Sequence, residues 1–348
     1  MAKMKIEVQA ARAKKHGLSL RDRLVGYLPH YAPHAAKLAG LLNLRNRIPE
    51  LAWLTERLTG FAAERPLPKW RRDIFRPRTS ARDLAEADVI LFADTFNLYF
   101  EPDNLIAADT VLRRAGLQVA HAAAPDEPDA RPLCCGRTFL SAGLVDEARA
   151  EMTRTLAALR PALERGAFIV GLEPSCTFTF RDEALVLAGD LITEDQAQQF
   201  MLFEEFIAMK HEDGTLDLKL APLPAGKALL HGHCHQKAFN VMTPVQAVLG
   251  LVPGLEVELV QSSCCGMAGS FGYQAETLEV SKAMGELSLL PAVRAAEADT
   301  LIVADGTSCR HQIADGTPRE AVHVAQVLRD ASDRALQQQE QEQERAAI

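Results

Sequence analysis

The 348-residue sequence lacks several features that would place it in common classes of protein. Its longest apolar stretches, such as residues 301–304, have the length of a strand, whereas a membrane-spanning helix needs about 20 apolar residues. Residues 1–15 are basic and polar and lack the apolar segment of a secretory signal. No P-loop, G-x-G-x-x-G motif or Ser-His-Asp arrangement is evident. These absences predict a cytoplasmic protein without a transmembrane segment, in which disulfides are not the default state of cysteine.

Acidic residues are scarce at the start of the chain. Residues 1–80 contain 17 Lys and Arg but only 6 Asp and Glu, although the net charge of the whole chain is −8. No zinc-finger, RNA-binding or helix-turn-helix signature accompanies these bases, so we expect no binding of nucleic acid. Their helical spacing favours a solvated helix face. Contact with an acidic partner, or peripheral contact with the inner face of a membrane, stays open.

The first 80 residues also lack strand-like β-branched runs, and they predict proline-broken helices at 18–28, 34–44 and 50–62. From Ala87 onward short apolar runs alternate with helical patterns, which is typical of parallel-sheet α/β folds. We therefore predict an α/β protein with two repeated parallel-sheet lobes preceded by a helical N-terminal segment. The expected boundaries are 1–82 for a basic helical leader, 83–222 and 223–334 for the two repeats, and 335–348 for a disordered tail rich in Gln and Glu.

The expected elements of the two lobes follow one rhythm. Expected strands cover Val89–Phe92, Gly116–Val119, Phe168–Val170, Ala228–His231, Val257–Val260 and Leu301–Ala304. Expected helices cover Leu105–Arg114, Ala142–Leu159, Gln199–Met209, Pro244–Leu249, Glu276–Leu287 and Ala321–Leu328.

Cysteine marks the internal repeat. Cys134-Cys135-Gly136 returns as Cys264-Cys265-Gly266 at an offset of 130, and Cys176 returns as Cys309 at an offset of 133. The seventh cysteine, Cys234, has Thr95 at the matching place in the first copy. Single cysteines are often just small buried side chains. Because all seven lie at landmarks of the repeat, a shared chemical role is the better interpretation.

The positions of the cysteines predict a metal–sulfur centre. Cys176, Cys234 and Cys309 each follow a predicted strand, and ligand sites of open α/β sheets lie at the carboxyl ends of the strands. The pairs at 134–135 and 264–265 precede a glycine and a helical pattern, so we expect helix N-termini that favour thiolates. Thiolate sets in a cytosolic protein indicate zinc or iron–sulfur. A vicinal pair does not match the C-x2-C knuckles of structural zinc sites, which favours iron–sulfur.

With these residues the sequence resembles the CCG, or cysteine-rich, domain. This domain occurs twice in the B subunit of heterodisulfide reductases and also in glycolate oxidase iron–sulfur subunits and lactate-utilisation proteins. The second copy fits the pattern, since 29 residues separate Cys234 from Cys264 and 43 separate Cys265 from Cys309. The resemblance implies that these four cysteines bind a [4Fe–4S] cluster. It also implies a metal-binding role for Cys134, Cys135 and Cys176.

Nearly the whole chain resembles the region after the ferredoxin module of large FAD- and iron–sulfur-containing D-lactate dehydrogenase-type oxidases. The phrases His231–Lys237 and Ser308–Gln312 carry this likeness, together with the leader. It implies an electron-transfer subunit, or a truncated reading frame, that works with a FAD-binding dehydrogenase and a ferredoxin-type module. The flavin would then lie on a partner chain or missing domain. Cluster-based disulfide reduction and a zinc-bound or metal-free assembly module are the alternatives.

Departures from the family pattern limit what can be transferred. Thr95 replaces a cysteine in the first copy, and Glu173 and Gly306 stand where a terminal C-x2-C would begin. The first copy therefore has an incomplete set of thiols unless Glu173 or an outside ligand completes it.

Further residues are expected to contact the cofactor. Among the histidines these are His231, His233, His235 and His311, as neighbours of the cluster or, for His233 and His235, as direct ligands, with an exposed or capping role as the alternative for each. Gly136 and Gly266 are expected at close approaches or turns.

Overall fold

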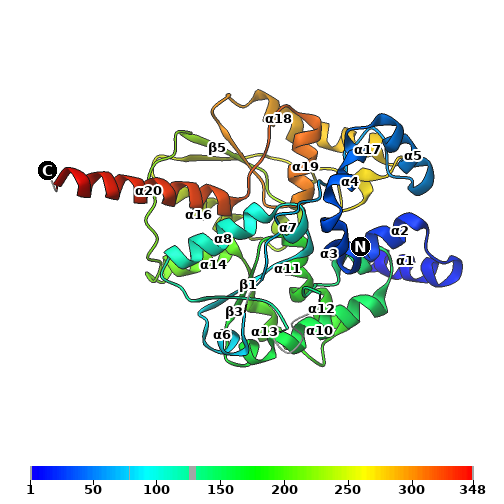
Figure 1. Ribbon diagram of the computed structural model, residues 1–348, viewed down its shortest axis with the longest axis horizontal. Helices are drawn as coiled ribbons and strands as arrows, with labels where there is room; N and C mark the ends of the chain where they lie inside the picture. The colour runs from blue at the N-terminus through cyan, green and yellow to red at the C-terminus, as the bar shows by residue number, and fades with distance from the viewer. Residues whose placement is uncertain (1, 78, 125–130, 347–348) are drawn as a thin grey trace.

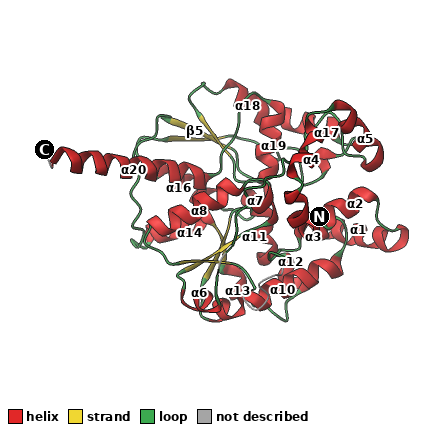
Figure 2. Ribbon diagram, viewed as in Figure 1, coloured by secondary structure: helices red, strands yellow, loops and turns green. Residues whose placement is uncertain are grey.

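The computed structural model describes residues 2–77, 79–124 and 131–346 and has two parallel sheets in separate lobes. Figure 2 shows the two sheets apart from each other, with helices packed around both. The leader lies on one side of the lobes, and the C-terminal helix projects from the opposite side (Figure 1). The predicted α/β class, with two parallel-sheet lobes after a helical segment, is confirmed.

The leader is a series of short helices. Ser19 caps α2 by accepting a hydrogen bond from the Asp22 N–H, and Gly60, with a φ of +78°, ends α5. The leader is tied to both lobes, since Tyr27 donates a hydrogen bond to Glu147 and Arg65 pairs with Asp315. Its elements are α1 (Ala2–His16), α2 (Leu20–Gly26), α3 (Leu28–Lys37), α4 (Ala39–Leu42), the 3-10 turn η1 (Asn43–Asn46) and α5 (Pro49–Thr59).

The first lobe contains a four-stranded sheet in the order β2-β1-β3-β4, with all neighbours parallel. The central strand β1 is an unbroken apolar run with every residue buried, as expected for a sheet covered on both faces. Its strands are β1 (Val89–Phe92), β2 (Val119–His121), β3 (Phe168–Gly171) and β4 (Phe200–Leu202). Its helices are α6 (Ala81–Glu86), α7 (Thr95–Tyr99), α8 (Pro102–Arg114), α9 (Arg137–Ser141), α10 (Val145–Glu164), α11 (Pro174–Arg181), α12 (Glu183–Leu187), α13 (Glu194–Gln198) and α14 (Phe203–Glu212).

The second lobe repeats this topology with a sheet in the order β6-β5-β7. A parallel bridge from Val303 to Val322 stands where the first lobe has β4. Its strands are β5 (Lys227–Leu230), β6 (Glu256–Leu259) and β7 (Leu301–Val303). Its helices are α15 (Cys234–Ala238), α16 (Met242–Gly250), the 3-10 turn η2 (Phe271–Tyr273), α17 (Leu278–Glu286), α18 (Leu289–Ala295), α19 (Thr307–Gly316) and α20 (Val324–Ala346).

One hydrophobic cluster joins the lobes. It combines first-lobe side chains such as Leu112 and Phe206 with second-lobe side chains such as Val248 and Leu328. These residues lie on α8, α14, α16 and α20, which form a layer between the two sheets (Figure 1). The layer therefore belongs to the hydrophobic core of both lobes.

Some of the expected elements differ from the structure. The segment Gln199–Met209 begins with strand β4 rather than helix, because Phe200 and Leu202 pair with β3. Strand β2 begins only at Val119, since Gly116 has a φ of +79° in the turn after α8. Helix α20 continues to Ala346 through most of the expected disordered tail, while 347–348 lie outside the described residues. The predicted domain boundaries remain predictions.

Candidate metal centre

The four cysteines of the second lobe lie at the carboxyl ends of its strands. Cys234 begins α15 just after β5, Cys309 lies in the first turn of α19 after β7, and Cys264 and Cys265 occupy the loop after β6. The Cys234 thiol contacts Cys264, Cys264 contacts Cys265, and Cys265 contacts Cys309. The structure thus brings the four sulfurs into one continuous group.

The contacts within this group shift the pKa values of its four thiols in opposite directions. Contact with the Cys234 and Cys265 thiols lowers the pKa of Cys264, and contact with Cys265 lowers the pKa of Cys309. The same contacts, together with burial, raise the pKa values of Cys234 and Cys265. Four thiols in such close contact do not all ionise without a balancing positive charge. A bound metal would supply the positive charge that all four thiolates need.

Cationic and polar groups surround these sulfurs. Lys237 faces all four cysteines, and its ammonium donates hydrogen bonds to the backbone carbonyls of Ser262 and Ser263, at 2.5 and 3.0 Å. Burial lowers the pKa of Lys237. His231 is buried, its Nε2 has no hydrogen-bond partner, and its ring lies within 4.8 Å of the sulfurs of Cys265 and Cys309. A soft, partly charged pocket with an unpaired ring nitrogen fits a metal–sulfur centre.

Gly266 fixes the loop that carries the cysteine pair. Its φ is +94°, and a Cβ at this position would lie 2.3 Å from the carbonyl oxygen of Ser281. The Gly266 N–H points back to the Cys264 sulfur at 3.3 Å. No helix begins directly after Gly266, contrary to our expectation, because α17 starts only at Leu278. In the first lobe the expectation holds, since Gly136 caps α9.

The first lobe gathers its own cysteines in a matching place. Cys134 contacts Cys135, and Cys135 contacts Cys176. The contact with Cys135 lowers the pKa of Cys176, but burial, Asp94 and Glu173 raise it to about 12. Burial and the neighbouring Glu173 also raise the pKa of Asp94, to about 7. This environment is acidic and favours neutral thiols.

The pattern of the repeat holds at the helix that follows the first strand of each lobe. Thr95 begins α7 after β1 as Cys234 begins α15 after β5, so the missing cysteine is replaced by a threonine at an equivalent position. Both carboxyl oxygens of Glu173 already accept hydrogen bonds, and its role as a ligand stays a prediction. Its Oε1 accepts the hydroxyl hydrogen of Ser175 at 2.8 Å, and its Oε2 accepts the Thr307 N–H at 2.9 Å.

The histidines named from the sequence occupy different environments. His233 caps α15, and its ring packs against Gly306, where any Cβ would lie 2.3 Å from the ring. His235 lies 3.7 Å from the Cys234 sulfur through Nδ1 and meets Arg137 through Nε2. Burial and Arg137 lower the pKa of His235 to about 3, so its ring is neutral. His311 instead hydrogen-bonds to Tyr273 at 2.7 Å.

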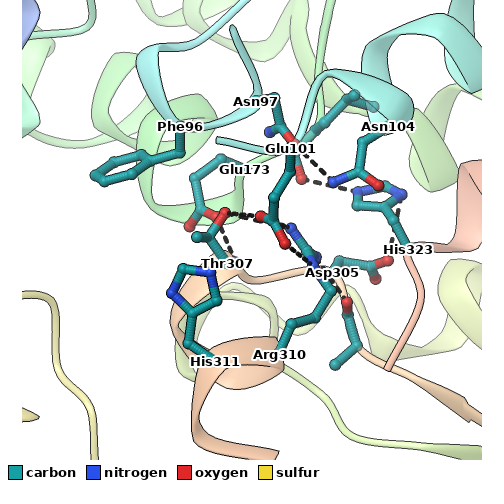
Figure 3. A network of polar contacts seen from close by, with 12 residues as sticks. Phe96, Asn97, Glu101, Asn104, Glu173, Asp305, Thr307, Arg310, His311 and His323 are labelled. Carbon is teal, nitrogen blue, oxygen red and sulfur yellow. Dashed lines mark hydrogen bonds and ion pairs between the residues drawn. The ribbon is translucent and has the colours of Figure 1, made fainter. Parts of the chain in front are cut away.

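Polar contacts across the lobes hold the helix of Cys309 in place. Glu101, in the first lobe, accepts hydrogen bonds from Arg310 Nε at 2.9 Å and from the Thr307 hydroxyl at 2.7 Å. Figure 3 shows these three side chains pointing toward one another, with Glu173 beside them. Sequence reasoning missed this network and Lys237. The phrases His231–Lys237 and Ser308–Gln312 contained two of the residues, but Glu101 carries no motif.

Together the fold and the site define a two-lobed, cysteine-rich α/β protein. Residues 228–314 match the model of the CCG family, which is described as a cysteine-rich domain, and this segment contains all four second-lobe cysteines. The resemblance inferred from the sequence is therefore confirmed. Among the described residues, no helix has the length and apolar character that crossing a membrane requires.

Three relatives illustrate the similarity of the whole chain. The C subunit of anaerobic glycerol-3-phosphate dehydrogenase from Escherichia coli K12 is 27% identical over 333 residues, which cover 93% of this chain and 81% of that protein. D-2-hydroxyglutarate dehydrogenase of Pseudomonas putida is 26% identical over 89% of this chain, which spans only 30% of the relative. Lactate utilization protein A of Bacillus velezensis is 28% identical over 63% of this chain and 89% of its own length.

Proposed function

We propose that this chain is an iron–sulfur electron-transfer subunit of a FAD-linked 2-hydroxy-acid dehydrogenase of the D-lactate or glycolate type. The observation that carries the proposal is the continuous group of four thiols in the second lobe, on a segment that matches the CCG family. Relatives named as a dehydrogenase subunit, a dehydrogenase and a lactate utilization protein support it.

In this proposal Cys234, Cys264, Cys265 and Cys309 hold a [4Fe–4S] cluster, which supplies one-electron chemistry. Other side chains of this chain support the cluster. Lys237 fixes the loop of the cysteine pair and balances thiolate charge. The exposed Cys234 places one edge of the site near the surface, where electrons can enter or leave.

The flavin and the oxidation of the hydroxy acid belong, in this proposal, to a FAD-binding partner subunit, with a ferredoxin-type module passing electrons between them. The chain then works on the cytoplasmic side, with peripheral contact at the inner membrane face as a further element of the proposal. The three first-lobe cysteines are a secondary site, because their acidic, buried surroundings oppose thiolates.

The test is anaerobic purification of the full chain followed by analysis of metal, acid-labile sulfide and disulfide reductase activity. We expect brown protein with iron and sulfide and no reduction of disulfides. Iron and sulfide together with turnover of a disulfide substrate would instead support cluster-based disulfide reduction. Colourless protein with one zinc per chain would refute the proposal in favour of an assembly module.

A further inference from the structure

Two carboxyl groups meet in the buried junction between the lobes, away from the cysteines. Glu204 lies in the first turn of α14 in the first lobe, and Asp305 follows β7 in the second. Both are 0% exposed, and His323, also 0% exposed, lies beside them. Ligand atoms of the three residues lie within 4.8 Å of one another.

The two carboxyl groups have very different partners. Asp305 accepts hydrogen bonds from Gln236 Nε2 at 2.8 Å and from the Val324 N–H at 3.1 Å, which favours an ionised carboxylate. Neither oxygen of Glu204 has a hydrogen-bond partner. An ionised carboxylate without donors, buried beside a second carboxylate, would cost several kcal/mol. Glu204 therefore needs a proton or a cation.

The contacts of His323 indicate whether a proton or a metal ion is bound here. Its Nδ1 lies 3.0 Å from the Ala325 N–H, which donates to it, and its Nε2 lies 3.1 Å from the Leu172 carbonyl oxygen, to which it donates. Burial lowers the pKa of His323, in agreement with a neutral ring. Both ring nitrogens are thus engaged with the backbone, and no lone pair of the ring is left for a metal. Figure 3 shows His323 and Asp305 facing each other in this junction.

We infer that Glu204 and Asp305 form a proton-binding site that joins the two lobes, in which a neutral Glu204 keeps its proton and donates a hydrogen bond to the ionised Asp305. Burial and the nearby Asp305 raise the pKa of Glu204 well above its usual range. The pair carries one negative charge instead of two. It connects to the metal centre through Gln236, which also accepts the N–H of His233 at 2.8 Å, next to Cys234.

Charged groups around the pair agree with this assignment. Glu205 adds negative charge near Glu204 but is itself paired with Arg181 at 2.9 Å. Arg310 interacts electrostatically with Asp305 and His323 and forms an ion pair with Glu101. Glu101 also interacts electrostatically with His323. Among the described residues, no Lys or Arg forms an ion pair with Glu204. Its one basic neighbour is His323, 3.9 Å away, whose ring is neutral. The proton is the remaining source of positive charge.

Infrared spectroscopy of the full chain at neutral pH tests the inference. We expect a carbonyl stretch of a protonated carboxylic acid, above the amide band, that shifts only slowly in heavy water because it is buried. Because the raised pKa of buried Asp94, about 7, can add a second such band, the comparison is made in an Asp94→Asn background, where the band should disappear with Glu204→Gln and persist with the matched control Glu205→Gln. A wild-type protein without such a band, or a band that Glu204→Gln retains in that background, would overturn the inference. So would one divalent ion per chain that is lost in Glu204→Gln but kept in Cys309→Ala.

Urea unfolding against pH gives a second readout. Because the folded-state pKa of Glu204 is raised above its usual value of 4.5, the folded state holds a proton that the unfolded chain releases above that pH. As the pH rises above the usual value of 4.5, the unfolding constant of the wild type should therefore increase relative to that of Glu204→Gln, by up to tenfold per pH unit. Parallel pH profiles of the two proteins would contradict a shared proton. If Glu204→Gln fails to fold, the slowly exchanging band decides when it persists in Asp94→Asn, and its loss in that variant would overturn the inference.

Discussion

Replacement of Gly266 by alanine tests whether the loop of the cysteine pair depends on its backbone geometry. The φ of +94° disfavours any side chain, at a cost of about 1–2 kcal/mol. The added Cβ would also lie 2.3 Å from the Ser281 carbonyl oxygen, so α17 or the loop must shift, which costs a further ~1–3 kcal/mol. We expect Gly266→Ala to lower the free energy of unfolding by about 2–5 kcal/mol. It should also lose most of its bound metal, because the shift moves Cys264 and Cys265.

The matched control for this variant is Gly254→Ala. Gly254 has a similar φ of +75°, but nothing lies within 4 Å of an added Cβ, so only the backbone cost of about 1–2 kcal/mol applies. Urea denaturation and metal content, measured on both variants and the wild type, separate the two contributions. Equal stability of the two variants, with full metal content in Gly266→Ala, would refute the reasoning.

Two further variants probe the charges around the centre. Lys237→Met removes the cation that faces the four sulfurs. In a redox titration it should lower the reduction potential by on the order of tens of millivolts. The control Lys227→Met, at a partly exposed lysine, should leave the potential unchanged. Glu101→Gln should lower the free energy of unfolding by about 3 kcal/mol in urea, because it leaves the buried Arg310 without its partner. Burial would raise the pKa of Glu101, but Arg310 lowers it to about 2. The ionised form therefore stabilises the wild type above pH 4.5, and this contribution should fade as the pH falls toward 2, so that the wild type loses more stability in acid than Glu101→Gln does. An unchanged potential, or acid profiles that coincide, would count against these two roles.

The fold could be predicted where the sequence has strong local patterns. Apolar runs such as Val89–Phe92 marked the central strands, because strands buried on both faces must be apolar throughout. The misassigned segment Gln199–Met209 is apolar too, and its division into β4 and α14 depends on pairing with β3, which is a tertiary effect. Helix α20 extends into a polar tail that was expected to be disordered because of its polarity, although its Gln, Glu and Ala residues are strong helix formers.

The sequence predicted the site mainly through the positions of its cysteines. The repeat located both cysteine sets, and the structure brings each set together. Glu101, Glu204 and Asp305 were missed, because isolated acidic residues carry no motif and acquire their role only where the lobes meet. The placement of His311 against Tyr273 likewise depends on how α19 packs.

The central claim is that the thiols of the second lobe bind one metal centre. Its most direct test counts iron and records the electron paramagnetic resonance spectrum of the reduced, anaerobically purified protein, for the wild type and for Cys309→Ala and Cys134→Ala. We expect an iron–sulfur signal in the wild type, its loss with most of the iron in Cys309→Ala, and a largely preserved signal in Cys134→Ala. A signal and iron content that survive in Cys309→Ala would contradict the claim.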